Sequence, residues 1–229
     1  PGEDEVVKYE PLYLDVILIK QAPSLALGNA KKELLHLGSY AMRSFELAYD
    51  YIVNNTEKSA DKGHKTEEAI NKIDEDLTRY LIDLSSEPLS QKESEVLTNI
   101  LDSSRDLERI GDHGEALINL TDYIRRKKVE FSPAALQELD LIYNMTLSFI
   151  KESLKSVEDN DIELANSLVA KHEAIDKMER KLRKTHIHRL NRGECSTQAG
   201  VNFIDIISHY TRVADHAMNL AEKVQAEQI

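Results

Sequence analysis

The sequence contains two copies of one motif, and this duplication restricts the fold more than any other feature. The first copy reads RDLERIGDHGEALIN at residues 105–119, and the second reads SHYTRVADHAMNLAE at residues 208–222. Identical residues lie 103 positions apart at Asp102/Asp205, Arg109/Arg212, Asp112/Asp215, His113/His216 and Leu117/Leu220. Upstream, residues 68–74 match residues 173–179 at an offset of 105. Because these segments recur in the same order, the chain consists of two copies of one unit.

The hydrophobic pattern predicts the fold class. Apolar residues recur at helical spacing through most of the chain, and no stretch alternates with a period of two. We therefore expect an all-α protein in which six long antiparallel helices form two tandem three-helix bundles. The expected parts are a leader at residues 1–22, a first repeat at 23–128 and a second repeat at 129–229.

Local signals indicate where individual helices begin and end. Ser90 and Glu93 have the spacing of a capping box, which predicts a helix N-terminus at this point. Asn160, together with Glu163, is expected to cap the fifth long helix. Gly63 lies in a polar stretch, where we expect a turn before the second helix. The leader shows little helical periodicity and is expected either to pack along the body or to connect to something upstream.

Composition excludes several classes of function. The formal net charge of −12 argues against nucleic acid and against an anionic membrane surface, because both attract basic faces. The single cysteine, Cys195, excludes an internal disulfide and fits a reducing compartment. Cys195 has no CxxC partner and no histidine in a triad-like context, so we expect no catalytic role for it. Apolar runs such as residues 16–19 are far shorter than the ~20 residues that span a bilayer, and no signal peptide is visible.

Three segments resemble a known family. The hexapeptide ERIGDH at residues 108–113, with its echo at 211–216, resembles the signature of PhoU-type domains, in which three helices form each repeat. Residues 10–34 resemble the segment that joins the membrane part of bacterial Na⁺/phosphate cotransporters to a C-terminal PhoU-like domain, and THIHRLNRG at 185–193 resembles the same subgroup. The resemblance covers nearly the whole chain.

The resemblance implies a regulatory role rather than catalysis. In the leading hypothesis, the chain is a non-catalytic domain on the cytoplasmic face of a prokaryotic plasma membrane. Its expected partner is the membrane transport domain of the same polypeptide, which residues 1–22 would connect to it, and a homodimer is compatible with this role. One alternative is a free-standing PhoU-type regulator that partners a phosphate ABC transporter or a sensor kinase. Another is a metal-dependent phosphohydrolase with two carboxylate-bridged metals about 3.5–4 Å apart.

The resemblance also implies metal ligands, because several family members carry iron or zinc on acidic motifs of the second and third helices. The matching positions are Glu67 and Asn71 with Glu108 and Asp112 in the first repeat, and His172 and Asp176 with Thr211 and Asp215 in the second. Asn71 and Thr211 depart from the acidic pattern, whereas His172 keeps a ligand. Oxygen ligands with an occasional imidazole suit Fe, Zn or Mn.

A second polar stripe lies on each third helix. Steps of three and four residues place Asp102, Asp106, Arg109 and His113 on one face, and Asp205, His209, Arg212 and His216 on its counterpart. Asp102, Asp106, Asp205 and His209 are therefore secondary candidates for metal ligands. Half-buried carboxylates need a counter-charge. It could be a metal ion, or Arg109 and Arg212 could reach across to acids on a neighbouring helix.

Overall fold

The computed structural model describes residues 11–54, 56–226 and 229, and among them it contains helices but no strand. The helices are α1 (Val16–Gln21), α2 (Pro23–Asn54), α3 (Glu57–Leu84), α4 (Gln91–Arg126), α5 (Pro133–Asp159), α6 (Ile162–Asn191) and α7 (Thr197–Gln225). The predicted all-α fold with six long helices is confirmed. Within the described ranges, no helix has both the length and the apolar character needed to cross a bilayer.

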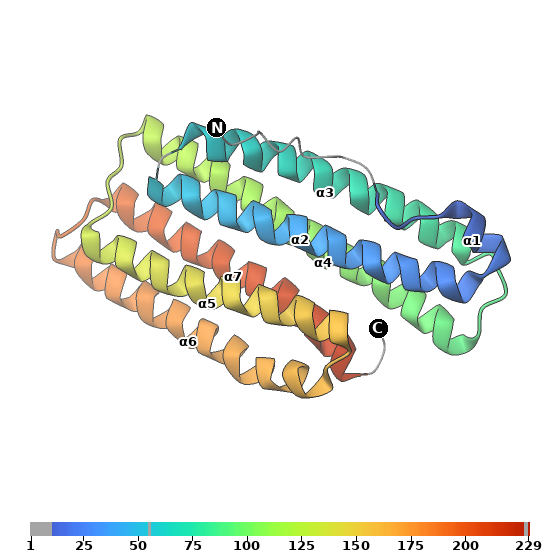
Figure 1. Cartoon of the computed structure of the whole chain (residues 1–229). Helices are drawn as coiled ribbons and strands as arrows, with labels where there is room; N and C mark the ends of the chain where they lie inside the picture. Colours follow the sequence, from blue (N-terminus) through green and yellow to red (C-terminus); the bar gives the residue numbers. More distant parts are fainter. Residues whose placement is uncertain (1–10, 55, 227–228) are drawn as a thin grey trace, which may run out of the picture.

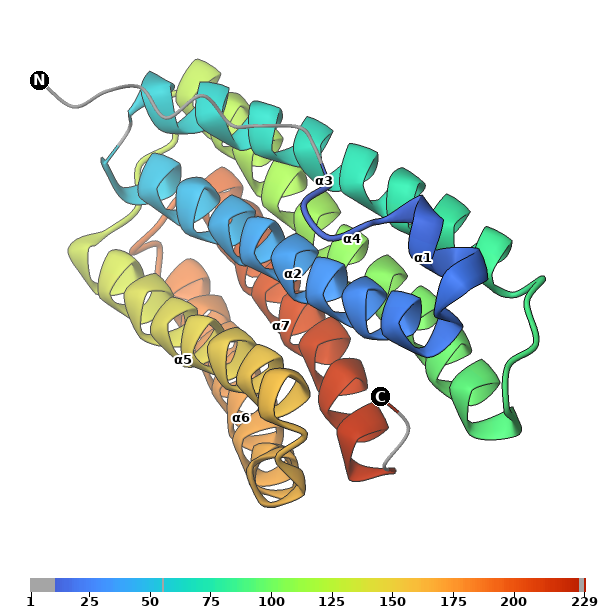
Figure 2. The same cartoon turned by 45° about the vertical axis from the view of Figure 1, so that its right-hand side comes forward.

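The two repeats lie side by side and pack on each other through their inner helices (Figures 1 and 2). Helices α2, α3 and α4 form the first bundle, and α5, α6 and α7 form the second. The repeats meet where α4 packs on α7 and α2 packs on α5, whereas α3 and α6 lie on the outside. The third helices, which carry the duplicated motif, are therefore brought into contact with each other.

An aromatic cluster joins the two bundles into one hydrophobic core. Phe45 of α2 makes an edge-on contact with Tyr210 of α7 at 5.2 Å between ring centroids. Tyr143 of α5 lies 5.3 Å from Phe45 and stacks on Tyr49 at 3.5 Å. Phe45 and Tyr210 are completely buried. Because aromatic side chains bury large apolar areas, this cluster stabilises the contact between the repeats.

The predicted helix ends are confirmed at one position and wrong at another. Ser90 and Glu93 form the expected capping box, in which each side chain binds a backbone amide of the other residue. The cap of α6 is Asp161, whose carboxylate accepts the Leu164 N–H at 2.9 Å. Asn160, which was expected to cap this helix, instead ends α5 in the left-handed conformation (φ 51°). Asparagine tolerates this conformation better than most residues, which explains its position there.

The predicted turn at Gly63 is also wrong. Helix α3 begins at Glu57, and Gly63 is buried inside it. A Cβ at this position would lie 2.1 Å from the Cδ1 of Ile118 on α4. The glycine therefore allows α3 to approach α4 closely.

The leader was predicted to lack helical structure, and part of it does form a helix. Its first ten residues lie outside the described residues, but α1 forms between two prolines and packs on α2 and α3. The preceding backbone is held by Glu33, which is completely buried and accepts the N–H groups of Leu12 at 2.8 Å and Tyr13 at 2.7 Å. The Nδ1 of His36 lies 2.8 Å from the same carboxylate. The described part of the leader therefore packs against the body, as expected.

Candidate functional site

Three predicted ligands of the second repeat come together between α6 and α7. His172 and Asp176 lie one turn apart on α6, and Asp215 faces them from α7. The Nε2 of His172 lies 2.9 Å from an Oδ1 of Asp215, and one ligand atom from each residue lies within 4.8 Å of the others. Over the described part of the chain, no other group of three or more histidine, cysteine or acidic side chains comes this close. One imidazole and two carboxylates suit Zn²⁺, Fe²⁺ or Mn²⁺.

The corresponding residues of the first repeat do not converge in this way. The amide of Asn71 donates to Glu67, so it occupies a carboxylate oxygen instead of offering a second charge. Burial and the nearby Glu115 carboxylate raise the pKa of Glu67, and burial and Asp112 raise the pKa of Glu108. The first repeat therefore has an acidic face, but no compact set of ligands comparable to that of the second.

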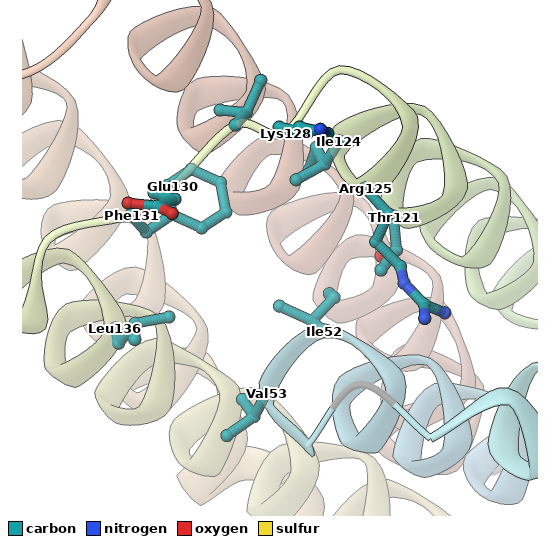
Figure 3. Close-up of a pocket in the computed structure, with 10 residues that line it drawn as sticks. Ile52, Val53, Thr121, Ile124, Arg125, Lys128, Glu130, Phe131 and Leu136 are labelled. Atoms are coloured by element: carbon teal, nitrogen blue, oxygen red, sulfur yellow. The ribbon is translucent and has the colours of Figure 1, made fainter.

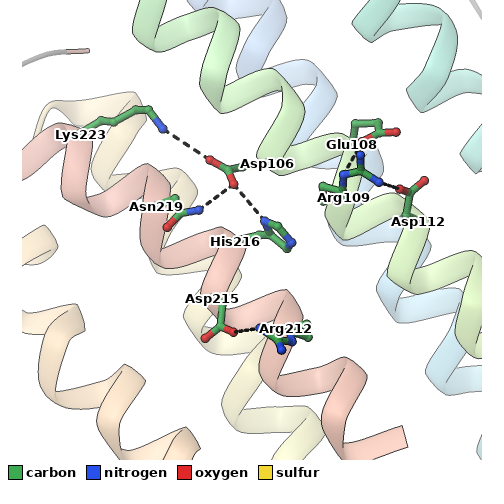
Figure 4. A network of polar contacts seen from close by, with 9 residues as sticks. All are labelled: Asp106, Glu108, Arg109, Asp112, Arg212, Asp215, His216, Asn219 and Lys223. Atoms are coloured by element: carbon green, nitrogen blue, oxygen red, sulfur yellow. Dashed lines mark hydrogen bonds and ion pairs between the residues drawn. The ribbon is translucent and has the colours of Figure 1, made fainter. Parts of the chain in front are cut away.

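The predicted role of Arg109 and Arg212 is wrong. Each arginine binds an acid on its own helix: Arg109 lies 2.8 Å from Asp112, and Arg212 lies 3.5 Å from Asp215 (Figure 4). Their side chains are 61% and 70% exposed, so each pair contributes at most about 1 kcal/mol. An acid three residues along the same helix is within easier reach than one on another helix. A metal bound at Asp215 would compete with Arg212.

The secondary candidates Asp106 and His209 lie in the α4–α7 interface, where the two polar stripes face each other. Asp106 of α4 accepts from Asn219 of α7 at 2.8 Å and lies 2.9 Å from the Nδ1 of His216 (Figure 4). Two turns further along α4, the Nδ1 atoms of His113 and His209 lie 3.0 Å apart. The helices therefore run antiparallel, and the Asp106–His216 and His209–His113 contacts are equivalent under the repeat.

The two ends of this interface differ in charge. Burial raises the pKa of Asp106, but hydrogen bonds from His216 and Asn219 and the charge of Lys223 outweigh it and leave the pKa lowered. Burial is the main cause that lowers the pKa of His113 to about 4, and the neighbouring histidines and the charges of Arg212 and Arg109 add to it. Burial also lowers the pKa of His209. Asp106 is therefore ionised at neutral pH and the His113–His209 pair is uncharged.

The other two secondary candidates take no part in these contacts. Asp102 and Asp205 are both exposed on their helices. Asp205 acts only at a distance, where its charge opposes the lowering of the His209 pKa. The periodicity of the sequence identified the stripe, but it did not show that only Asp106 and His113 of the first copy contact side chains of the second repeat.

Cys195 has a histidine neighbour that the sequence did not indicate. Its Sγ lies 3.7 Å from the Nε2 of His186, whose other ring nitrogen contacts Arg189 and not an acid, so the arrangement is not a catalytic triad. The loop after α6 turns back and places the cysteine there. His186 is buried and stacks on Phe203 at 4.3 Å, and its pKa is lowered by burial and by Arg189. A buried imidazole with a lowered pKa is a weak base, so this contact is one of packing.

A cavity of about 470 Å³ lies at the junction of the two repeats (Figure 3). The end of α2 contributes Ile52 and Val53, and Phe131 and Leu136 come from the connection and the start of α5. Arg125 also lines it but donates to the Tyr51 hydroxyl at 2.5 Å. The lining combines apolar side chains with the polar residues Thr121, Arg125, Lys128 and Glu130.

Two copies of a three-helix unit, each with the same Arg-x-x-Asp-His motif on its last helix, define a class of duplicated helical-bundle proteins. Within this class, the chain belongs to the PhoU family, because the PhoU domain model matches residues 34–121 and again residues 139–224. Among curated relatives, the phosphate-specific transport system accessory protein PhoU homolog 1 of Thermotoga maritima is 32% identical over 133 residues, 58% of this chain and 56% of that protein. The putative inorganic phosphate export protein YjbB of Escherichia coli K12 is 26% identical over 79% of this chain but only 33% of its own length. The chain thus spans about half of the first relative and a third of the second.

Solved structures share the fold. The phosphate transport system regulatory protein PhoU from Streptococcus pneumoniae has a TM-score of 0.79 at 21% identity, covering 90% of this chain and 99% of that one. PhoU from Pseudomonas aeruginosa has a TM-score of 0.80 at 19% identity, covering 86% and 94%. At these identities the likeness concerns the arrangement of the helices.

Proposed function

We propose that this chain is a PhoU-type regulator of phosphate transport that acts by binding a transport protein and not by catalysis. The observation that carries the proposal is the PhoU domain match in both repeats. The relatives support it, because one is named an accessory protein of phosphate-specific transport and another a putative phosphate export protein.

The extent of the match favours a free-standing regulator. The chain covers nearly all of the Streptococcus pneumoniae PhoU, so its described body has the size of a whole PhoU protein. A second candidate is a regulatory domain of a larger transporter, of which a Na⁺/phosphate cotransporter is the specific form suggested by the leader. The match to one third of the export protein favours this candidate. The two are distinguished by the complete gene product, since only the second requires membrane-spanning helices upstream of Pro1.

The regulatory role is tested by measuring phosphate uptake in the native host. Cells with and without the gene are grown in limiting and in excess phosphate, and uptake of radiolabelled phosphate is measured. We expect the difference between the two conditions to be lost on deletion and restored by expression of the wild-type chain. If uptake responds equally with and without the gene, the proposal is wrong.

We also propose that His172, Asp176 and Asp215 bind one divalent ion of the Zn²⁺, Fe²⁺ or Mn²⁺ type. Such an ion would neutralise two carboxylates and tie α6 to α7. The phosphohydrolase alternative requires two ions 3.5–4 Å apart, and three ligands do not suffice for that arrangement. Protein purified without chelator is analysed for metal, as wild type and as Asp176→Asn. One equivalent of metal less in Asp176→Asn than in the wild type supports the site, and equal content in both proteins refutes it.

A further inference from the structure

The α4–α7 interface contains three histidines, whose ring nitrogens lie farther apart as a set than the ligand atoms of the α6–α7 group. The Nδ1 atoms of His113 and His209 point at each other across the interface at 3.0 Å. Two imidazole nitrogens bound to one ion at about 2.0–2.1 Å lie about 3.3 Å apart in tetrahedral geometry. The two nitrogens therefore need to move apart only slightly to bind the same ion.

A third histidine makes the contact with a carboxylate that metal-binding histidines usually make. The Nδ1 of His216 faces the carboxylate of Asp106 at 2.9 Å, and Asn219 and Lys223 bind the same carboxylate. Histidines that bind metals typically give their other nitrogen to a carboxylate, which fixes the ring and makes the free nitrogen more basic. Here the free nitrogen is the Nε2 of His216, which has no hydrogen-bond partner within the described ranges.

The three rings are close together and remain accessible. The centroid of the His113 ring lies 5.1 Å from that of His209 and 5.7 Å from that of His216. The His216 side chain is 25% exposed, so an ion can reach the group from solvent. Burial lowers the pKa of His113 and His209, which leaves both rings neutral at pH 7. Neutral imidazole is the form that binds metals.

We propose that His113, His209 and His216 form a metal site for a Zn²⁺-type ion, with Asp106 as the residue that orients His216. His113 and His209 bind through Nδ1, and His216 turns to bring its Nε2 to the same ion. Imidazole ligands favour Zn²⁺, Ni²⁺ and Cu²⁺ over Mg²⁺ and Ca²⁺. The site differs from the α6–α7 group in its ligands and in its effect, since its ion links the first repeat to the second. The inference is independent of the proposed function.

The test isolates this site in a full-length background that lacks the other one. In the double variant His172→Ala with Asp176→Asn, Zn²⁺ is titrated by calorimetry, and Co²⁺ is used as a spectroscopic probe. We expect one equivalent of Zn²⁺ to bind, and we expect Co²⁺ to give the visible bands of nitrogen coordination. Adding His209→Ala or Asp106→Asn should lower the Zn²⁺ affinity by about 10–100-fold. Adding His188→Ala, at an exposed histidine of α6, should leave it unchanged.

Two results would overturn the proposal. The first is a double variant that binds no Zn²⁺ and gives no Co²⁺ bands. The second is an equal affinity after His209→Ala and His188→Ala. Circular dichroism in chelator verifies the fold of each variant. If His209→Ala does not fold, the Co²⁺ spectrum of the double variant decides alone, because that variant retains all three histidines. Mg²⁺ should not bind at this site in any of the variants.

Discussion

The equivalence of the two contacts in the α4–α7 interface predicts the effect of one substitution in detail. In the first repeat, Asp106 occupies the position that His209 occupies in the second, and it binds His216. The substitution His209→Asp should therefore place a carboxylate opposite His113 in the same geometry. The interface would then contain two aspartate–histidine pairs, and the pKa of His113 should rise because the charged ring gains a partner.

The magnitude follows from the pKa of His113. In the wild type, burial holds this pKa at about 4, whereas the unfolded chain has the ordinary value of 6.5. Between these two pH values, His113 binds a proton in the unfolded state but not in the folded state. The free energy of unfolding therefore decreases as the pH falls from 6.5 towards 4. At pH 5 the loss is about 2 kcal/mol, which decreases to about 1 kcal/mol when solvent screening of the half-exposed ring is allowed for. In His209→Asp the sign reverses, because a raised pKa stabilises the folded state below pH 6.5.

The assay is urea unfolding at pH 5 and pH 8, with chelator present. The loss of unfolding free energy between pH 8 and pH 5 should be smaller in His209→Asp than in the wild type by about 1–2 kcal/mol. Titrations at other positions cancel in this difference, and the loss of His209, whose pKa burial also lowers, acts in the same direction. The control is His188→Asp, which makes the same exchange at an exposed position without a facing histidine. The reasoning is refuted if both variants have the wild-type pH dependence, or if His209→Asp is more sensitive to acid.

Three further predictions concern stability and the leader. Gly114→Ala should lower the unfolding free energy by about 1–3 kcal/mol, because the new Cβ would lie 2.2 Å from the Oγ and 3.1 Å from the backbone carbon of Ser44. By contrast, Gly28→Ala should raise the unfolding free energy by about 0.5–1 kcal/mol, because nothing lies within 4 Å of its Cβ. Urea unfolding measures both changes. Glu33→Gln removes the buried charge that holds the leader amides, so limited proteolysis should cut the leader faster while the body stays intact. Tyr210→Phe should raise the midpoint of thermal unfolding slightly, by about 1 kcal/mol in free energy, because it removes a buried hydroxyl without a partner.

The parts of the fold that were predicted correctly depend on local or repeated signals. The capping box of Ser90 and Glu93 involves only neighbouring residues, so its sequence determines its geometry. The prediction of a turn at Gly63 was wrong because it relied on the polar residues Lys62, His64 and Lys65 around the glycine. That polarity is compatible with a helix whose buried side consists of small residues, which give little hydrophobic signal.

The site shows a different limit of sequence reasoning. Periodicity indicates which residues share a helix face, but not which helix covers that face. The stripe through Asp106 and His113 was therefore identified without its partners on α7. In contrast, the group of His172, Asp176 and Asp215 could be named beforehand, because the family resemblance identified the positions on both helices. The prediction that Arg109 binds an acid on a neighbouring helix did not take into account Asp112 on its own helix.

The antiparallel pairing of α4 and α7 has a consequence for how this protein could diverge. In a symmetric dimer of single repeats, one gene position would supply both ends of the interface, and every substitution would appear twice. Covalent linkage of the two repeats removes this constraint. One end here has the charged Asp106–His216 pair, and the other has the neutral His113–His209 pair. Because both repeats are in one chain, the two equivalent contacts can differ in chemistry, and mutation can alter each of them separately.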